Sequence, residues 1–101
     1  HAGDLKTIDR VIKIALQNNV NIGAHPSFPD KENFGRAIMD ISLKELETSL
    51  INQIELIQER LDIFGSTLHH VKVHGALYNL SAVNKETASV IINSIKKNLE
   101  V

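Results

Sequence analysis

Apolar residues in the first part of the chain recur at the spacing of an amphipathic helix. Between residues 5 and 19 the apolar positions fall three or four residues apart and share one helical face: Leu5, Ile8, Val11, Ile12, Ala15 and Leu16. Asp4 stands where a carboxylate accepts hydrogen bonds from the first free amides of a helix. We therefore predict a helix over 5–19, then a short strand over 20–25 (VNIGAH) that Pro26 ends.

The strongest helix signal follows a loop that runs from residue 26 to residue 41. Ser42 and Glu45 form a capping box, in which each side chain binds a backbone amide of the other residue. Seven apolar residues then make one continuous stripe: Leu43, Leu46, Leu50, Ile54, Ile57, Leu61 and Phe64. Gly65 suits the position just after a helix, where the backbone turns left-handed. The pattern predicts a helix over 43–64.

The last third of the chain holds a second strand and a third helix. The strand HHVKV ends at His74, and the segment GALYNLSAV after it reads as a turn with a short helical piece. Asn84 is placed to cap a final helix that runs to about residue 98. The inward positions of that helix are Ala88, Ile91, Ile92 and Ile95. Residues 99–101 resemble the beginning of another strand.

Strands that alternate with helices indicate an α/β fold with a parallel sheet. We expect residues 1–101 to form one partial domain, with three helices, two complete strands and the start of a third strand. Two strands cannot close a sheet or cover helices on both faces. The chain is therefore interpreted as a segment of an α/β barrel or of a doubly wound sheet.

Histidines end both predicted strands. His25 and His74 each precede a short turn, and His1 opens the chain just before the first predicted helix. In parallel α/β folds, ligands bind at the carboxyl ends of the strands, so these histidines are expected to converge on one pocket. The alternative is that they are half-exposed residues hydrogen-bonded to loop backbone, as isolated histidines commonly are.

Lys72 lies in the middle of the second strand. Side chains alternate along a strand, so Val71 and Val73 share one face, and His70, Lys72 and His74 share the other. A buried ammonium is costly unless it is paired. One interpretation is that Lys72 binds an anionic group of a ligand or exchanges protons with it. The other is that Lys72 forms a structural ion pair.

Further polar residues lie near these positions in the sequence. Arg36 lies in the second half of the long loop and is suited to bidentate binding of an anion. The alternative is that it is a solvated loop arginine. Tyr78 and Asn79, just past the turn at His74, are candidates for polar contacts with a substrate, although both are equally suited to packing or capping. His69 and His70 begin the second strand, at its far end. We expect His69 at the surface and His70 in a structural role.

Composition narrows the functional classes. Eleven basic and twelve acidic residues give a net charge of −1, so we expect no binding to nucleic acid or to an anionic membrane. Cysteine is absent, which excludes disulfides, thiolate metal sites and cysteine nucleophiles within these residues. Any metal would need histidine and carboxylate ligands. This composition is compatible with a cytoplasmic protein.

Three stretches resemble the LamB/YcsF family: HAGD at 1–4, GAHPSFPDKENFGR at 23–36 and HVKVHGALYN at 70–79. One departure is Val73, which stands where many relatives have proline. The resemblance extends from one end of the chain to the other. It implies an irregular parallel (β/α) barrel of the glycoside hydrolase/deacetylase type, of which this chain is a segment.

The resemblance also implies an activity, which is ATP-dependent hydrolysis of the cyclic amide 5-oxoproline to glutamate, carried out with two partner subunits, B and C. ATP is then a cosubstrate, although no P-loop pattern occurs in these residues. Lys72, His74 and His25 are the expected catalytic residues. By analogy with the superfamily, His1 and His25 are candidate ligands of a divalent metal. Two alternatives stay open: a metal-dependent deacetylase, and a subunit that binds substrate while its partners catalyse.

Overall fold

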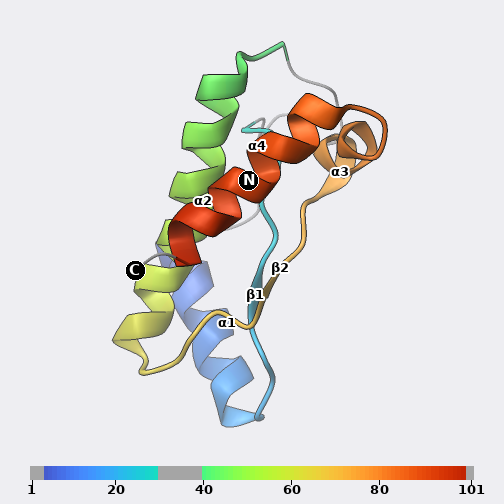
Figure 1. The fold of residues 1–101 in the computed structure, drawn as a ribbon. Helices are drawn as coiled ribbons and strands as arrows, with labels where there is room; N and C mark the ends of the chain where they lie inside the picture. The colour runs from blue at the N-terminus through green and yellow to red at the C-terminus, as the bar shows by residue number, and fades with distance from the viewer. Residues whose placement is uncertain (1–3, 30–39, 100–101) are drawn as a thin grey trace.

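The computed structural model describes residues 4–29 and 40–99. Its elements follow in the order α1 (Leu5–Gln17), β1 (Gly23–Ala24), α2 (Leu43–Ile63), β2 (His70–Val71), α3 (Gly75–Ser81) and α4 (Lys85–Leu99). The two strands lie side by side, with α2 and α4 along one side of them (Figure 1). α1 lies at the end where the strands begin, and α3 follows the end where β2 finishes (Figure 1).

Three of the helix starts are capped by the residues that the sequence predicted. Side-chain oxygens of Asp4, Ser42 and Asn84 accept hydrogen bonds from the backbone amides of Thr7, Glu45 and Thr87, at 2.8, 3.1 and 2.9 Å. Each bond satisfies an amide that has no partner within its own helix. The pKa of Asp4 is lowered, mainly because the carboxylate accepts the backbone amide of Thr7. Local chemistry thus sets where these helices begin.

The end of α2 is also set locally. Gly65 has a φ of +73°, a left-handed conformation that costs glycine little. Its amide donates to the carbonyl of Asp62 at 3.0 Å, and the amide of Ser66 donates to the carbonyl of Leu61 at 2.9 Å. These two bonds satisfy carbonyls that the helix itself leaves without donors. The predicted role of Gly65 is confirmed.

The two strands form a parallel pair, as the alternation of elements predicted. Gly23 is the register partner of His70, and Ala24 is the partner of Val71. The pairing continues beyond the strands, because the amide of His74 donates to the carbonyl of Pro26 at 2.9 Å. Both chain segments therefore leave the sheet together and in the same direction.

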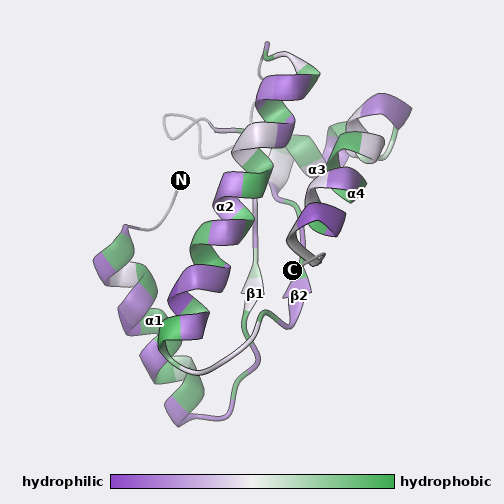
Figure 2. Ribbon diagram, turned by 60° about the vertical axis from the view of Figure 1, so that its left-hand side comes forward, coloured by the Kyte–Doolittle hydropathy of each residue, from purple (hydrophilic) through white to green (hydrophobic). Residues whose placement is uncertain are grey.

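The main hydrophobic core lies among α2, α3, α4 and the segment after β1. It contains Phe28, Leu46, Leu50, Ala76, Leu77, Val90 and Ile91. Hydrophobic and hydrophilic residues alternate along α1 and α2, as expected of helices that bury one face (Figure 2). Among the helices of the described residues, none is long and apolar enough to cross a membrane.

The structure differs from the sequence prediction at several places. Within the described residues there are four helices rather than three, because the short helical piece expected after His74 forms a helix of its own, α3. Leu99, expected to begin a strand, is the last residue of α4. α1 ends at Gln17, and Asn19 takes a left-handed φ of 56°. Among the expected inward residues, Leu5, Val11, Leu43, Phe64 and Ile92 are exposed.

β2 and Lys72, which follows it directly, are less buried than expected. His70 and Lys72 are exposed, while Val71 and Val73 are half-buried. Ala24, the register partner of Val71, is buried against the helices. The two faces of the strand pair therefore differ as predicted, but no described element covers the face that carries His70 and Lys72.

Candidate functional site

The carboxyl ends of β1 and β2 bring two histidines into contact. His25 follows β1 directly, and His74 is the N-cap residue of α3, three residues beyond β2. Nε2 of His25 lies 2.8 Å from Nδ1 of His74, and the two rings meet edge to face with centroids 4.6 Å apart. His25 is exposed and His74 is half-buried. Two residues that are 49 positions apart in the chain thus form one hydrogen-bonded pair.

The backbone fixes the proton positions in this pair. Nδ1 of His25 lies 2.6 Å from the carbonyl oxygen of Lys72, which accepts hydrogen bonds and cannot donate them. His25 therefore donates through Nδ1–H, and Nε2 of the neutral ring is left as an acceptor. It follows that His74 donates through Nδ1–H in the neutral pair. The N–H bond at Nδ1 of His74 then points at His25, and Nε2 of His74 carries no proton.

A cavity of about 390 Å³ lies at this pair. It is lined by His25, Lys72, Val73, His74, Gly75, Tyr78 and Asn79. Five of these residues, His25, Lys72, His74, Tyr78 and Asn79, are the candidate residues that the sequence indicated. They come from the end of β1, the segment after β2 and the helix α3. The cavity therefore gathers imidazole, ammonium, phenol and amide groups around one volume.

Lys72 contributes to the site twice. Its carbonyl accepts the Nδ1–H of His25, and its amide donates to the carbonyl of Ala24 at 2.9 Å. Its side chain is exposed and lines the cavity. Among the described residues no carboxylate forms an ion pair with Lys72, so an anion that enters the cavity meets a positive charge that those residues do not neutralise.

Two candidate residues lie outside the described residues. They are His1, the candidate metal ligand, and Arg36, the candidate anion-binding residue. His69 and His70 lie at the opposite end of β2, where Nδ1 of one is 3.0 Å from Nδ1 of the other. Neither lines the cavity.

The described residues do not fit a metal centre. Within residues 4–29 and 40–99, no group of three or more histidine, cysteine or acidic side chains is arranged to hold an ion. Both ring nitrogens of His25 are engaged in hydrogen bonds, one to a carbonyl and one to His74. A metal at His25 Nε2 would have to replace the bond to His74. No step is therefore assigned to a metal.

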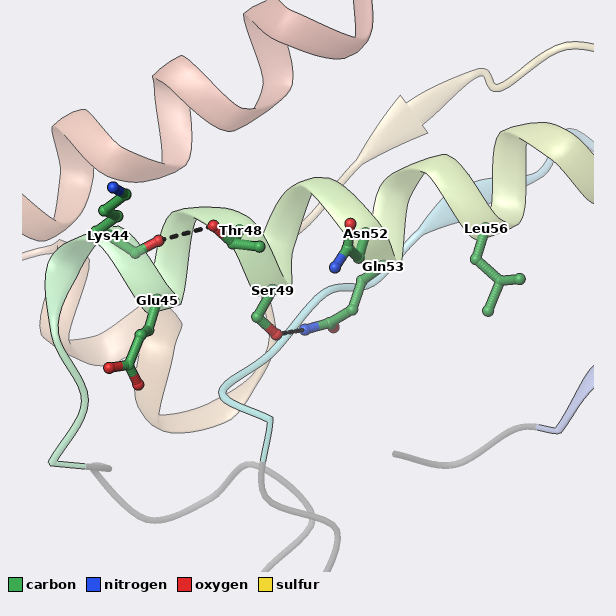
Figure 3. A pocket seen from close by; sticks show the side chains of 7 residues that line it. All are labelled: Lys44, Glu45, Thr48, Ser49, Asn52, Gln53 and Leu56. Carbon is green, nitrogen blue, oxygen red and sulfur yellow. Dashed lines mark hydrogen bonds between the residues drawn. The ribbon is translucent and has the colours of Figure 1, made fainter.

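Larger hollows exist elsewhere in the described structure. One of about 570 Å³ lies along an exposed face of α2, between Lys44 and Leu56 (Figure 3). Another of about 440 Å³ lies between α1, β1 and α2 and is mainly apolar, with Val11 and Leu56 in its wall. Neither brings together titratable groups from separate elements as the histidine cavity does. Convergent polar chemistry, rather than volume, marks the candidate site.

A contact between α2 and the segment after His25 was not predicted from the sequence. The side-chain amide of Gln53 bonds to both backbone groups of Ser27, at 3.0 and 2.9 Å. The available signal was weak, because Gln53 is a polar residue between the buried positions Leu50 and Ile54. A polar side chain beside the buried face of an amphipathic helix indicates a hydrogen-bond partner, but the sequence does not show which residue that partner is.

A parallel α/β segment with histidines and a lysine at its strand ends is the arrangement that the sequence motifs implied. The chain belongs to the LamB/YcsF family, which it matches over residues 1–100. It is 45% identical over 96 residues to the A subunit of 5-oxoprolinase from Histophilus somni (strain 129Pt), covering 95% of this chain and 39% of that protein. It is 44% identical over 95 residues to the same subunit from Bacillus cereus (strain B4264), covering 94% and 38%.

The fold is also similar to a solved structure. The lactam utilization protein from Thermus thermophilus superposes with a TM-score of 0.92 at 38% sequence identity. The superposition covers 96% of this chain and 39% of that protein. The chain thus spans about two fifths of the length of the relatives that it matches.

Proposed function

We propose that this chain is part of the A subunit of an ATP-dependent 5-oxoprolinase and contributes catalytic residues to it. The observation that supports this proposal most strongly is the match to the A subunit of 5-oxoprolinase over 95% of the chain. The convergence of His25, Lys72 and His74 on one cavity supports the catalytic part of the proposal. In this proposal the chain is a segment of an irregular (β/α) barrel, acts with 5-oxoprolinase subunits B and C, and works in the cytoplasm.

The reaction opens an unstrained amide, which is a poor electrophile at neutral pH. In the proposed sequence the lactam oxygen attacks the γ-phosphoryl group of ATP, and ADP leaves. Water then adds to the activated ring carbon, and the carbon–nitrogen bond breaks to free the amine and leave an acyl phosphate. A second water hydrolyses this acyl phosphate to give glutamate and phosphate. Protons leave the water and reach the ring nitrogen. The site must therefore stabilise negative charge and move protons.

The lining residues match these two tasks. Lys72 binds the substrate carboxylate or stabilises the charge that develops on the transferring phosphoryl group. The His25–His74 pair transfers protons, with His74 Nε2 as the accepting nitrogen of the neutral pair. Tyr78 and Asn79 make polar contacts to the substrate, and Arg36 is a further candidate for binding its anionic groups. This choice of nitrogen rests on the bond between His25 Nδ1 and the Lys72 carbonyl.

The test is glutamate release from 5-oxoproline and ATP by the full-length A subunit with subunits B and C, comparing wild type with Lys72→Met. We expect at least about a 100-fold loss for Lys72→Met, since a charge aimed at the transition state is removed. Lys13→Met is the matched control, because Lys13 is an exposed lysine on α1 and should leave the rate within about twofold.

Three other outcomes are informative. Equal turnover by wild type and Lys72→Met would contradict the catalytic role of Lys72 and favour a substrate-binding subunit whose partners catalyse. Absence of turnover by wild type with all subunits present would contradict the proposed function. Release of an acetyl group from an amide without ATP would instead support the deacetylase alternative.

A further inference from the structure

Gln53 on α2 binds the backbone of the segment that leaves β1. Its Oε1 accepts the amide of Ser27 at 3.0 Å, and its Nε2 donates to the carbonyl of Ser27 at 2.9 Å. Nε2 also donates to Oγ of Ser49, one helical turn earlier, at 3.0 Å. Figure 3 shows Ser49 and Gln53 side by side on α2, with this last bond dashed. One side-chain amide thus pairs with a whole backbone unit, as a neighbouring strand would.

The chemistry of this contact requires an amide at position 53. If the side-chain amide were flipped, its NH₂ group would face another donor, the Ser27 N–H, and its oxygen would face another acceptor, the Ser27 carbonyl. Both hydrogen bonds would be lost, so only one orientation of the amide fits. A carboxylate in the same place accepts from the Ser27 amide but offers nothing to the Ser27 carbonyl. Ser27 is only 1% exposed, so water cannot readily replace a lost partner.

The segment that Gln53 binds leads directly to the histidine pair. Ser27 lies two residues after His25 and one after Pro26, whose carbonyl accepts the amide of His74 at 2.9 Å. His25 itself bonds to the carbonyl of Lys72 and to the ring of His74. The backbone beside His25 is therefore held from two sides, by the segment after β2 and by Gln53.

We propose that Gln53 is a positioning residue for the reaction, which holds Pro26 and Ser27 so that His25 Nε2 stays in hydrogen-bonding distance of His74. The proposal deepens the proposed function and rests on it. Gln53 does not line the histidine cavity, so it acts through the backbone of Ser27 and not on the substrate.

The first experiment replaces Gln53 by glutamate in the full-length A subunit, which is then tested for activity with subunits B and C. Gln53→Glu keeps the shape of the side chain and removes the donor to the Ser27 carbonyl. We expect kcat to fall about 10- to 100-fold with KM within about threefold, because a small misplacement of a proton-transfer group lowers the rate more than binding. Asn52→Asp makes the same amide-to-acid change at the adjacent exposed position and should leave both constants within about twofold.

The pH dependence of the Gln53→Glu variant gives a further test, because protonation of the new carboxyl group should restore activity. In Gln53→Glu, a protonated carboxyl group regains an O–H donor beside its carbonyl acceptor, so it can pair with both groups of Ser27 again. The activity of Gln53→Glu relative to wild type should therefore rise as pH falls toward the pKa of a carboxyl group, about 4.3. Gln53→Met loses the same bonds without a titratable group, and its relative activity should not rise.

Nitrogen-15 spectra of the histidines separate this proposal from the proposed function. We expect the Nδ1 and Nε2 resonances of His25 to change in folded Gln53→Glu and to remain in Asn52→Asp. Unchanged His25 resonances, or a loss of rate that only follows the unfolded fraction of the variant, would overturn the positioning role even if wild type is active. A wild type without turnover would overturn the proposed function, while the spectra would still report on Gln53.

Discussion

The two ends of the β1–β2 pair each carry two neighbouring histidines, and the two pairs are built differently. At the carboxyl end, His25 and His74 come from separate strand ends, and a backbone carbonyl fixes the proton of His25. At the other end, His69 and His70 are adjacent in the chain and exposed, with ring centroids 5.2 Å apart. The comparison teaches that residue type alone does not mark a site. Convergence from separate elements, anchored by the backbone, distinguishes the first pair.

In the second pair, His70 packs against β1. The imidazole of His70 lies over Gly23, its register partner, in the space that a side chain at position 23 would occupy. A Cβ atom added at Gly23 would overlap the ring of His70. The absence of a side chain at Gly23 thus lets His70 lie across β1. This contact uses the shape of the histidine and not its ability to transfer protons.

The largest effect predicted from this comparison concerns His25. His25→Asn removes the ring that bridges the Lys72 carbonyl and His74, and with it the proton transfer that we propose for the pair. We expect glutamate release by the full-length A subunit with its partners to fall at least about 100-fold, the usual effect of losing acid–base catalysis. His69→Asn, the same change at the other end, should alter the rate by less than about twofold. Similar losses in both variants would remove the distinction between the two ends.

An intermediate effect is predicted for Gly23→Ala. The new methyl group forces the exposed His70 ring to rotate away, so we expect the free energy of unfolding to fall by about 1 kcal/mol. In the background of His70→Ala the same change should be neutral or stabilising by about 0.5 kcal/mol, since alanine loses less backbone entropy than glycine. Chemical denaturation of the four proteins gives the coupling between the two positions. A cost that persists without His70 would show that the ring is not the obstacle.

The smallest effect is predicted for the ion pair that joins α1 to α2 near the beginning of the strands. Asp9 accepts two hydrogen bonds from the Arg60 guanidinium, from Nε at 2.7 Å and from Nη2. These bonds lower the pKa of Asp9 and raise the pKa of Arg60. A lowered folded-state pKa means that the pair stabilises the protein above the unfolded pKa of aspartate, about 3.9, and that this contribution disappears as pH falls through the lower, folded value.

Asp9→Asn should therefore lower Tm slightly at neutral pH, and the difference from wild type should shrink below about pH 4 and vanish below the folded pKa of Asp9. Glu55→Gln is the control, because Glu55 is an exposed acid on the same helix as Arg60. Thermal unfolding at several pH values tests both variants. A difference between Asp9→Asn and wild type that stays constant down to low pH would contradict the assigned cause.

The sequence predicted the features that depend on nearby residues. The caps at Asp4, Ser42 and Asn84 and the turn at Gly65 follow from side chains within a few positions, and all four occur in the structure. The meeting of His25 and His74 was also predictable, because parallel strands place their carboxyl ends on the same edge. These predictions do not depend on how the helices pack against the strands.

The features that the sequence did not predict depend on contacts between distant elements. The short helical piece expected after His74 does form as α3, but its seven residues are too few for a helical period to set its bounds. Leu99 was assigned to a strand from three residues, although α4 simply continues to that position. The exposure of Lys72 depends on what covers its face of the strands, and the contact between Gln53 and Ser27 depends on tertiary packing. Patterns among neighbouring residues predict neither the exposure of Lys72 nor the contact between Gln53 and Ser27.

The most direct test of the account is a titration of the full-length A subunit with 5-oxoproline, without ATP, followed through the nitrogen-15 resonances of its histidines. The account predicts that the resonances of His25 and His74 shift with saturation while those of His69 and His70 do not move. Shifts at His69 and His70, or no shift at His25 and His74 while bound 5-oxoproline is detected by calorimetry, would contradict the assignment of the substrate site to the carboxyl ends of β1 and β2.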